Sequence, residues 1–347
     1  MNHEQRRGGY EALRYLFAKR YGRKQRAFRI AKKAIGSPST AALFDGASVA
    51  AFAGAFLGCL TTLAFSAIGI VPCIASALAT ALLCGLLLFT RAAGLFADAF
   101  PPALYGGTFG GMTPVIWLSE GGVRHPATLI GPLFISLSSL CGLVFFLVAK
   151  LDIRSAAPFG SGYGGRLGAI AAVASFLFVE LVGRFGTDVS RFRGIPTGIG
   201  VELWAVPLEY LASLGGILST MFALRQRRVA TAGIANRIFN ASVVALVGLL
   251  AMHLGSPDAT STLEAFYSGC FLGMSTRERL KGSFQPLFGA LVLSSTMLVL
   301  VRAILPGVGG SLGLAAFLTT ALLVVFTRAT ARIRKNVDND KHLDTKG

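Results

Sequence analysis

Charged residues are scarce in this sequence. Only 14% of the 347 residues are charged, whereas 53% are apolar and the mean hydropathy is +0.64. An ordinary soluble domain is about one quarter charged, so a chain of this composition could not hide its apolar surface from water. The abundance of apolar residues also excludes an intrinsically disordered chain. The sequence therefore predicts an all-α, polytopic integral membrane protein.

Groups that carry chemistry are scarce as well. The chain has four histidines, and its five cysteines lie in apolar segments without a CxxC pair or a histidine at metal-binding spacing. It has no P-loop, no HExxH motif and no pair of carboxylates or histidines placed for acid–base chemistry. We therefore expect no enzymatic activity, no catalytic residues, no metal site and no cofactor.

Negative charge is scarcer than positive charge. The chain has 33 Lys and Arg residues against 16 Asp and Glu residues, a net charge of +17. The first 40 residues contain 11 basic and 2 acidic residues, and residues 328–347 contain 6 basic and 3 acidic residues. Basic segments beside membrane spans stay in the cytoplasm. We therefore predict a multi-pass protein of the cell (inner) membrane, with both termini cytoplasmic and an even number of spans.

The N-terminal basic segment, residues 1–40, also contains aromatic residues. Several of them, including Tyr10, Tyr15 and Phe28, alternate with its cations. This composition is typical of an amphipathic helix on anionic lipid headgroups, and the alternative is a plain topology-determining tail. For a tail tethered to a bilayer, lipid is favoured over nucleic acid as the partner. The sequence leaves open whether the chain forms a homo-oligomer.

Eight segments are long and apolar enough to cross the hydrocarbon core of a membrane. They comprise residues 46–66, 72–90, 127–149, 167–183, 203–224, 238–254, 283–301 and 311–327. Two further apolar segments, 98–117 and 263–275, are shorter and rich in glycine. If these two cross, the protein has ten spans, and if they are re-entrant it has eight.

The two short segments contain the same motif. Residues 105–113 (YGGTFGGMT) and 267–275 (YSGCFLGMS) share the pattern Y-x-G-x-F-x-G-M-[ST]. Two shorter matches come after it in the same order, residues 132–134 with 286–288 and residues 164–168 with 309–313. Three matches in the same order indicate a duplicated unit. The predicted organisation is a basic tail (1–40), a first membrane repeat (41–184), a connector (185–202), a second membrane repeat (203–328) and a basic tail (329–347).

The loop charges favour ten spans. With ten spans, the cytoplasmic loops between spans carry 11 Lys and Arg residues and the outer loops carry 5, whereas with eight spans the split is 8 against 8. Five spans in each unit make the repeats inverted. We therefore predict about ten transmembrane helices in two inverted five-helix repeats, the middle helix of each being short, Gly-rich and broken. The alternative is eight spans plus two re-entrant elements.

The repeated motif is the best candidate for a functional site. Its glycine pairs and flanking prolines disfavour a continuous helix, so each motif segment is expected to break near the middle of the membrane. Transporters built from inverted repeats bind solutes at such paired breaks. The candidate residues of the solute path are Tyr105, Gly107, Thr108, Phe109, Gly111, Thr113, Tyr267, Gly269, Phe271, Gly273 and Ser275. Phe109 and Phe271 are expected to form an apolar constriction above and below the site.

A competing interpretation assigns the motif to packing alone. Gly107 with Gly111, and Gly269 with Gly273, are GxxxG pairs, which let two helices approach closely without binding a solute. The occurrence of the motif in both halves favours a path, because a two-fold axis would bring both copies to the centre of the protein.

Carboxylates inside the predicted spans form a second group of candidates. Glu209 and Glu180 are candidates for coupling to a proton or another cation. The alternative for Glu209 is an interfacial carboxylate or one paired with an arginine, and the alternative for Glu180 is an interfacial anchor. Glu264 is interpreted as isolated at the end of an element, and Arg302 as an interfacial anchor at the end of the ninth span.

The combined features favour a transporter or channel. The scarcity of buried carboxylates argues against a pump for several cations and favours a small polar or anionic solute. The alternative is a membrane-embedded scaffold, or a subunit of an envelope assembly, without transport activity. In that case the basic tail would bind a partner or lipid.

Overall fold

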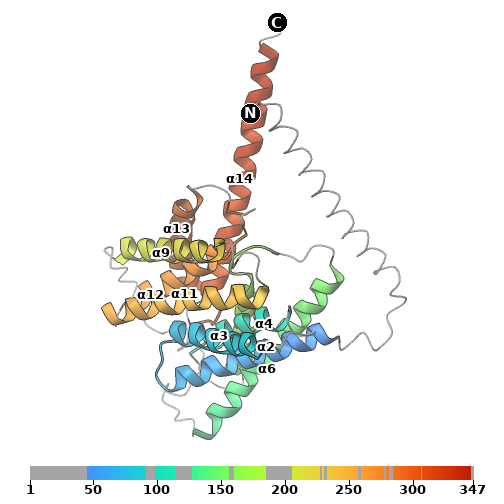
Figure 1. Ribbon diagram of the computed structural model, residues 1–347, viewed down its shortest axis with the longest axis vertical. Coiled ribbons are helices and arrows are strands. Elements are labelled where there is room, and N and C mark those ends of the chain that lie inside the picture. Colours follow the sequence, from blue (N-terminus) through green and yellow to red (C-terminus); the bar gives the residue numbers. More distant parts are fainter. Residues whose placement is uncertain are drawn as a thin grey trace, which may run out of the picture. The chain divides into compact units, whose positions relative to one another are not determined.

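The computed structural model describes residues 45–90, 98–114, 127–155, 160–184, 205–226, 229, 233–256, 259–276, 279–280, 284–305 and 307–344. Every regular element in these residues is a helix (Figure 1). The elements are α2 (Gly46–Ala67), α3 (Pro72–Phe89), α4 (Phe100–Gly110), α6 (Ala127–Arg154), α7 (Arg166–Arg184), α9 (Ala205–Arg225), α11 (Ile234–Gly255), α12 (Thr260–Gly273), α13 (Gln285–Thr296), the π-helix η2 (Met297–Ile304) and α14 (Ser311–Asp344). The predicted N-terminal tail (1–40) and connector (185–202) lie outside the described residues.

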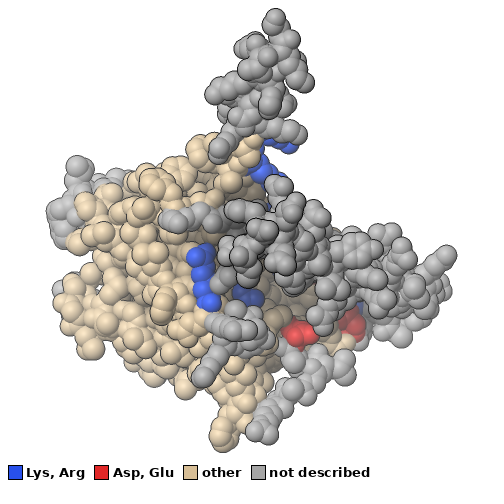
Figure 2. Space-filling model, turned by 45° about the horizontal axis from the view of Figure 1, so that its top comes forward, with Lys and Arg blue, Asp and Glu red and all other residues tan. Residues whose placement is uncertain are grey.

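Seven of the described helices are long and apolar enough to cross a membrane. They are Gly46–Ala67, Pro72–Phe89, Gly131–Arg154, Val206–Arg225, Ile234–Gly255, Gln285–Ile304 and Ser311–Arg332. The described surface in Figure 2 is almost entirely uncharged. Large apolar side chains such as Phe89 and Leu254 are 86% and 82% exposed. Apolar surface on this scale fits contact with lipid, and the structure is therefore consistent with a polytopic helical membrane protein.

Helix boundaries follow the prolines and the apolar runs. α3, α4 and α13 each have proline in their first two positions, where a missing backbone N–H costs nothing. The predicted span 283–301 is the continuous segment α13–η2, whose second part is a π-helix that sequence patterns do not reveal. The predicted span 311–327 covers only the apolar part of α14, because the helix continues to Asp344.

Two short helices, α4 and α12, form the buried centre. α4 has 11 residues and α12 has 14, and most residues of α4 and every residue of α12 from Ala265 to Gly273 are buried. At 1.5 Å per residue they are about 17 Å and about 21 Å long, less than the roughly 30 Å of a hydrocarbon core. α4 packs mainly on α2, and α12 packs mainly on α9.

The two halves of the chain meet along two further helix pairs. α3 lies against α11, and α7 lies against α14. Near the starts of α7 and α14, Gly168 and Gly313 face each other so closely that a Cβ on either would lie 2.5–2.6 Å from the Cα of the other. Glycine at both positions therefore permits direct contact of the two backbones.

Candidate functional site

The repeated motifs lie on α4 and α12, and neither helix is broken. α4 is continuous through Gly106 and Gly107 and ends at Gly110, and α12 is continuous to Gly273. α4 therefore has no break at its first glycine pair and ends at its second, Gly110 and Gly111, while α12 has no break at Gly269. Close packing on α2 and α9 compensates for the poor helix propensity of glycine, which is a weak preference compared with tertiary contacts. Beyond the first copy of the motif, residues 115–126 lie outside the part of the chain that the structure describes.

The motif glycines allow these close contacts. A Cβ at Gly107 would overlap the carbonyl oxygen of Ala55, and a Cβ at Gly269 would overlap that of Ser213. Gly111 lies against Cys59 and Thr62 of α2 in the same way, and Gly273 lies against Ile217 and Thr220 of α9. Helix packing therefore accounts for glycine at all four positions.

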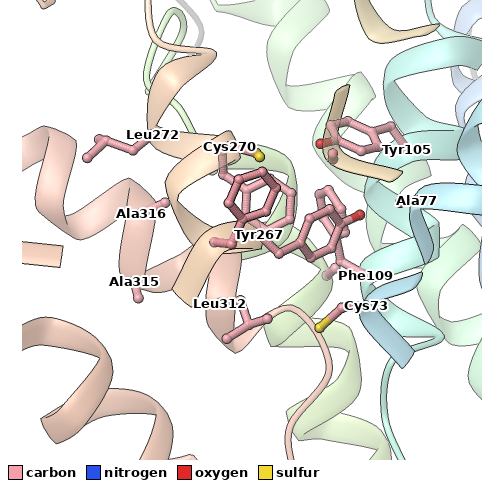
Figure 3. Packing of buried hydrophobic residues seen from close by; sticks show 14 of the residues in the cluster. Cys73, Ala77, Tyr105, Phe109, Tyr267, Cys270, Leu272, Leu312, Ala315 and Ala316 are labelled. Atoms are coloured by element: carbon pink, nitrogen blue, oxygen red, sulfur yellow. The ribbon is translucent and has the colours of Figure 1, made fainter. Parts of the chain in front are cut away.

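The motif aromatics meet between α4 and α12 (Figure 3). The ring centroids are 4.5 Å apart for Tyr105 and Phe109, 4.4 Å for Tyr267 and Phe271, and 4.6 Å for Phe109 and Phe271. All four side chains are at most 2% exposed. Phe109 and Phe271 therefore contact each other directly, so the prediction that they lie above and below a site is wrong. We call these four residues the ring stack.

A cluster of buried hydroxyl groups adjoins the ring stack. The Ser76 hydroxyl donates to Thr108 Oγ1 at 2.9 Å and lies 2.9 Å from the Tyr267 hydroxyl, while Thr80 Oγ1 lies 3.2 Å from Thr108 Oγ1. All four residues have no exposed surface. We call Ser76, Thr80, Thr108 and Tyr267 the hydroxyl cluster.

Sequence reasoning identified Thr108 and Tyr267 but missed Ser76 and Thr80. Their four-residue spacing on one face of the apolar helix α3 was the available signal. The other motif tyrosine, Tyr105, instead donates its hydroxyl hydrogen to the sulfur of Met274 at 3.5 Å. The two motif tyrosines therefore have different hydrogen-bond partners.

Thr113 and Ser275, the last residues of the two motif copies, each form hydrogen bonds through the side-chain hydroxyl group. Thr113 Oγ1 accepts a hydrogen bond from the Gly309 N–H at 3.1 Å and donates to the Gly110 carbonyl at 2.7 Å. Ser275 Oγ accepts a hydrogen bond from the Gly164 N–H at 2.9 Å. Each hydroxyl therefore joins the end of its motif helix to a glycine loop of the other half of the chain.

The buried carboxylate Glu209 is paired. It lies on α9, is 5% exposed and forms an ion pair with Arg302 of η2. The structure thus agrees with the alternative of pairing with an arginine, and it moves Arg302 from an interfacial anchor to a partner of a buried carboxylate. Glu180, the other coupling candidate, is half-buried on α7.

Glu264 is not isolated, contrary to the sequence interpretation. It is the fifth residue of α12, and it interacts electrostatically with Arg302 and with Glu209. No sequence pattern signals this group, because the three charged residues are separated by 55 and 38 positions in the chain.

A cavity lies beside the end of the first motif. Its volume is about 320 Å³, and it is lined by the end of α2, the turn before α3 and residues 112–114. A second recess, of about 470 Å³, lies at the end of α9 and includes Met221, Phe222 and Arg225 in its lining. In comparisons with protein-family models, curated proteins and solved structures, nothing matches this chain.

Proposed function

We propose that the protein is a membrane transporter or channel for a small polar or anionic solute, and that its path runs between α4 and α12. The observation that carries this proposal is the position of these helices. Both are too short to cross the hydrocarbon core alone, yet they are buried among the longer helices and meet through the ring stack. In membrane proteins, short Gly-rich elements surrounded by full spans are a common way to build a solute path.

In this proposal the structure corresponds to a closed state, and the ring stack is the gate. The hydroxyl cluster beside it supplies neutral donors and acceptors to a polar solute. The cavity at the end of α2 lies next to Met112 and Thr113, so it would lead from one end of the bundle to the first motif.

The proposal includes two inverted five-helix repeats, and matched contacts support the duplication. Gly58 of α2 faces Leu104 and Thr108 of α4, and Gly216 of α9 faces Phe266 and Cys270, the positions that the motif makes equivalent in α12. Ten spans would then place both termini in the cytoplasm and the recesses at the ends of α2 and α9 on opposite faces of the inner cell membrane.

The glycine loops before α7 and α14 match in the same way. Gly164 and Gly309 donate to the equivalent hydroxyls Ser275 and Thr113, and each is followed by a glycine with positive φ, +81° at Gly165 and +84° at Gly310. Such backbone angles are accessible mainly to glycine. These equivalent local contacts support a common origin of the two units.

A liposome experiment tests transport. The purified full-length protein is reconstituted, and the entry of urea, glycerol and sodium formate is followed by stopped-flow light scattering. We expect protein-dependent entry of at least one of these solutes. Phe109→Ala and Phe271→Ala are expected to speed entry, because they remove rings from the gate. Phe89→Ala on α3, whose side chain is 86% exposed, is the matched control and is expected to behave like the native protein.

Liposomes that stay as tight as protein-free ones, both with the native chain and with the ring-stack variants, would contradict transport. They would favour the alternative, a membrane-embedded scaffold or envelope subunit. The closed centre supports this alternative. The rings of the ring stack pack against one another, and the hydroxyl groups of the hydroxyl cluster form hydrogen bonds among themselves. A scaffold would bind its partner, or anionic lipid, through the basic tail, so deleting residues 1–34 would abolish capture of that partner while the protein still inserts.

A further inference from the structure

The hydroxyl cluster has fewer hydrogens than it has hydrogen-bond contacts. A hydroxyl group has one hydrogen to donate and two lone pairs that accept. Thr80 donates its hydrogen to the Ser76 carbonyl oxygen at 3.0 Å, and Thr108 donates to the Tyr105 carbonyl oxygen at 2.7 Å. The Ser76 hydroxyl donates to Thr108. The hydrogen between the Ser76 and Tyr267 hydroxyl groups therefore comes from Tyr267.

One contact in the cluster is left without a hydrogen. It joins Thr80 Oγ1 and Thr108 Oγ1, which are 3.2 Å apart. If Thr80 or Thr108 turned its hydrogen into this contact, a backbone carbonyl oxygen would lose that hydrogen instead. Of the donors and acceptors in the cluster, only acceptors are thus available to a solute. Such a site favours a solute that brings its own hydrogen-bond donors.

The packing that the two motif copies share does not require these hydroxyl groups. The glycine contacts are alike in both copies. However, the second copy has Cys270 where the first has Thr108, and Tyr105, the equivalent of Tyr267, donates to the sulfur of Met274. Burying polar side chains away from all solvent costs free energy. A role in binding accounts for that cost on the side where the hydroxyl groups gather.

Tyr267 belongs to both the ring stack and the hydroxyl cluster. Its ring lies among the other rings of the stack, 4.4 Å from Phe271 between centroids (Figure 3), and its hydroxyl lies 2.9 Å from Ser76 Oγ. When the ring stack opens as a gate, Tyr267 moves with it, and Ser76 Oγ loses the O–H group from which it accepts. An N–H group of a solute fits the same place, since N–H···O bonds have the same length of about 2.9 Å.

We infer that the hydroxyl cluster is the solute-binding site of the path, and that it takes a small neutral solute with N–H donors, of the urea and primary amide class. This inference rests on the proposed transport function. The solute donates to Ser76 Oγ in place of Tyr267. An anion such as formate offers only acceptors, and the hydroxyl hydrogens are already donated within the protein. A cation is disfavoured, because neutral hydroxyl groups do not compensate its charge inside the membrane.

Solute entry into the liposomes described above tests this inference. Urea is compared with formate and with guanidinium, a cation of the same shape as urea, and valinomycin with K⁺ balances the charge. We expect urea to enter fastest. Ser76→Ala removes the acceptor and should slow urea entry by about 2- to 10-fold, the effect of one hydrogen bond. Tyr267→Phe keeps the ring but removes the competing O–H group, so it should speed urea entry.

Ser242→Ala on α11 is the matched control and should leave urea entry unchanged. Ser242 is as buried as Ser76, and its hydroxyl donates to the Phe239 carbonyl oxygen at 2.8 Å, outside the cluster. The opposite effects of Ser76→Ala and Tyr267→Phe distinguish binding from stability, because a purely structural hydrogen bond would be lost in both variants and slow both alike. If Ser76→Ala does not fold, the direction of the change in Tyr267→Phe decides.

Urea entry that is unchanged in Ser76→Ala, slowed in Tyr267→Phe or equally slowed in Ser242→Ala would overturn the inference. Formate or guanidinium entering faster than urea would overturn it as well, while transport would stand. Liposomes that admit none of the three solutes, with the native chain and the ring-stack variants alike, would instead reject transport itself and this inference with it.

Discussion

Gly107 lies at a close approach between α4 and α2, so a single added methyl group tests the packing of the centre. Its Cβ would overlap the carbonyl oxygen of Ala55, and neither backbone can move without its helix. We expect Gly107→Ala to destabilise the protein by about 1–3 kcal/mol, as overpacking does. The measurement is the midpoint of thermal unfolding in detergent, followed by the helical circular dichroism signal.

Gly131→Ala is the matched control for this variant. Gly131 lies on α6, and a Cβ there would have no atom within 4 Å. Since alanine favours a helix over glycine by about 1 kcal/mol, the control should be neutral or more stable. Equal midpoints for the two variants would show that α4 and α2 are not in close contact. The same overlap means that bulky residues at Gly107 or Gly269 would damage folding before they reported on transport.

The ion pair of Glu209 and Arg302 allows a second prediction for single residues. Arg302→Gln leaves a carboxylate that is 5% exposed without its partner, which costs about 3–5 kcal/mol for a buried pair. Glu209→Gln combined with Arg302→Gln removes both charges and should recover most of the loss. The three unfolding midpoints, compared in one detergent, check this. A double variant as unstable as Arg302→Gln would contradict the role of pairing.

The repeated motif in the sequence predicted which two segments contain the candidate site, but it did not predict the conformation of those segments. The motif placed Tyr105, Phe109, Tyr267 and Phe271 on two short segments, and the structure brings them together at the centre. The helices continue through Gly107 and Gly269 because tertiary contacts there outweigh local propensity. Glu264 could not be predicted, since its partners depend on how three distant helices pack.

The π-helix η2 was not predicted, because one extra residue in a helical turn leaves no trace in an apolar run. Its eight residues include Arg302. π-helical segments are wider than α-helices, and they often arise at functional positions. Deleting the 57% exposed Val299 should therefore convert a wide turn into an α-helical one and be tolerated. Deleting Leu291 of α13, which is 55% exposed, should shift the helical register and prevent folding.

The yield of monodisperse protein in size-exclusion chromatography measures this difference. We expect the Val299 deletion to retain a folded peak and the Leu291 deletion to lose it. Loss of both peaks would contradict this prediction. It would mean that the π-helical turn that contains Arg302 is required for folding.

At the scale of the whole molecule, the arrangement of spans decides whether the repeats are inverted. The described helices alone fit both ten spans and eight spans with re-entrant α4 and α12, but the two arrangements place Gly233 and Ser256 on opposite sides. Gly233 precedes α11 and Ser256 comes directly after it, and both are exposed. With ten spans, Ser256 faces outward and Gly233 faces the cytoplasm, whereas with eight spans the two sides are exchanged.

Single cysteines at these two positions, labelled in intact cells with a membrane-impermeant thiol reagent, therefore distinguish the arrangements. Ile68 and Phe284, which are 75% and 76% exposed, are the references, because both arrangements place the first outside and the second inside. All five native cysteines are buried, so they should react slowly. Labelling of Ile68→Cys and Ser256→Cys, with Gly233→Cys and Phe284→Cys protected, is the expected result. The reverse result at Gly233 and Ser256 would make the repeats parallel. The recesses at the ends of α2 and α9 would then open to the same side, which excludes a path from one to the other across the bilayer.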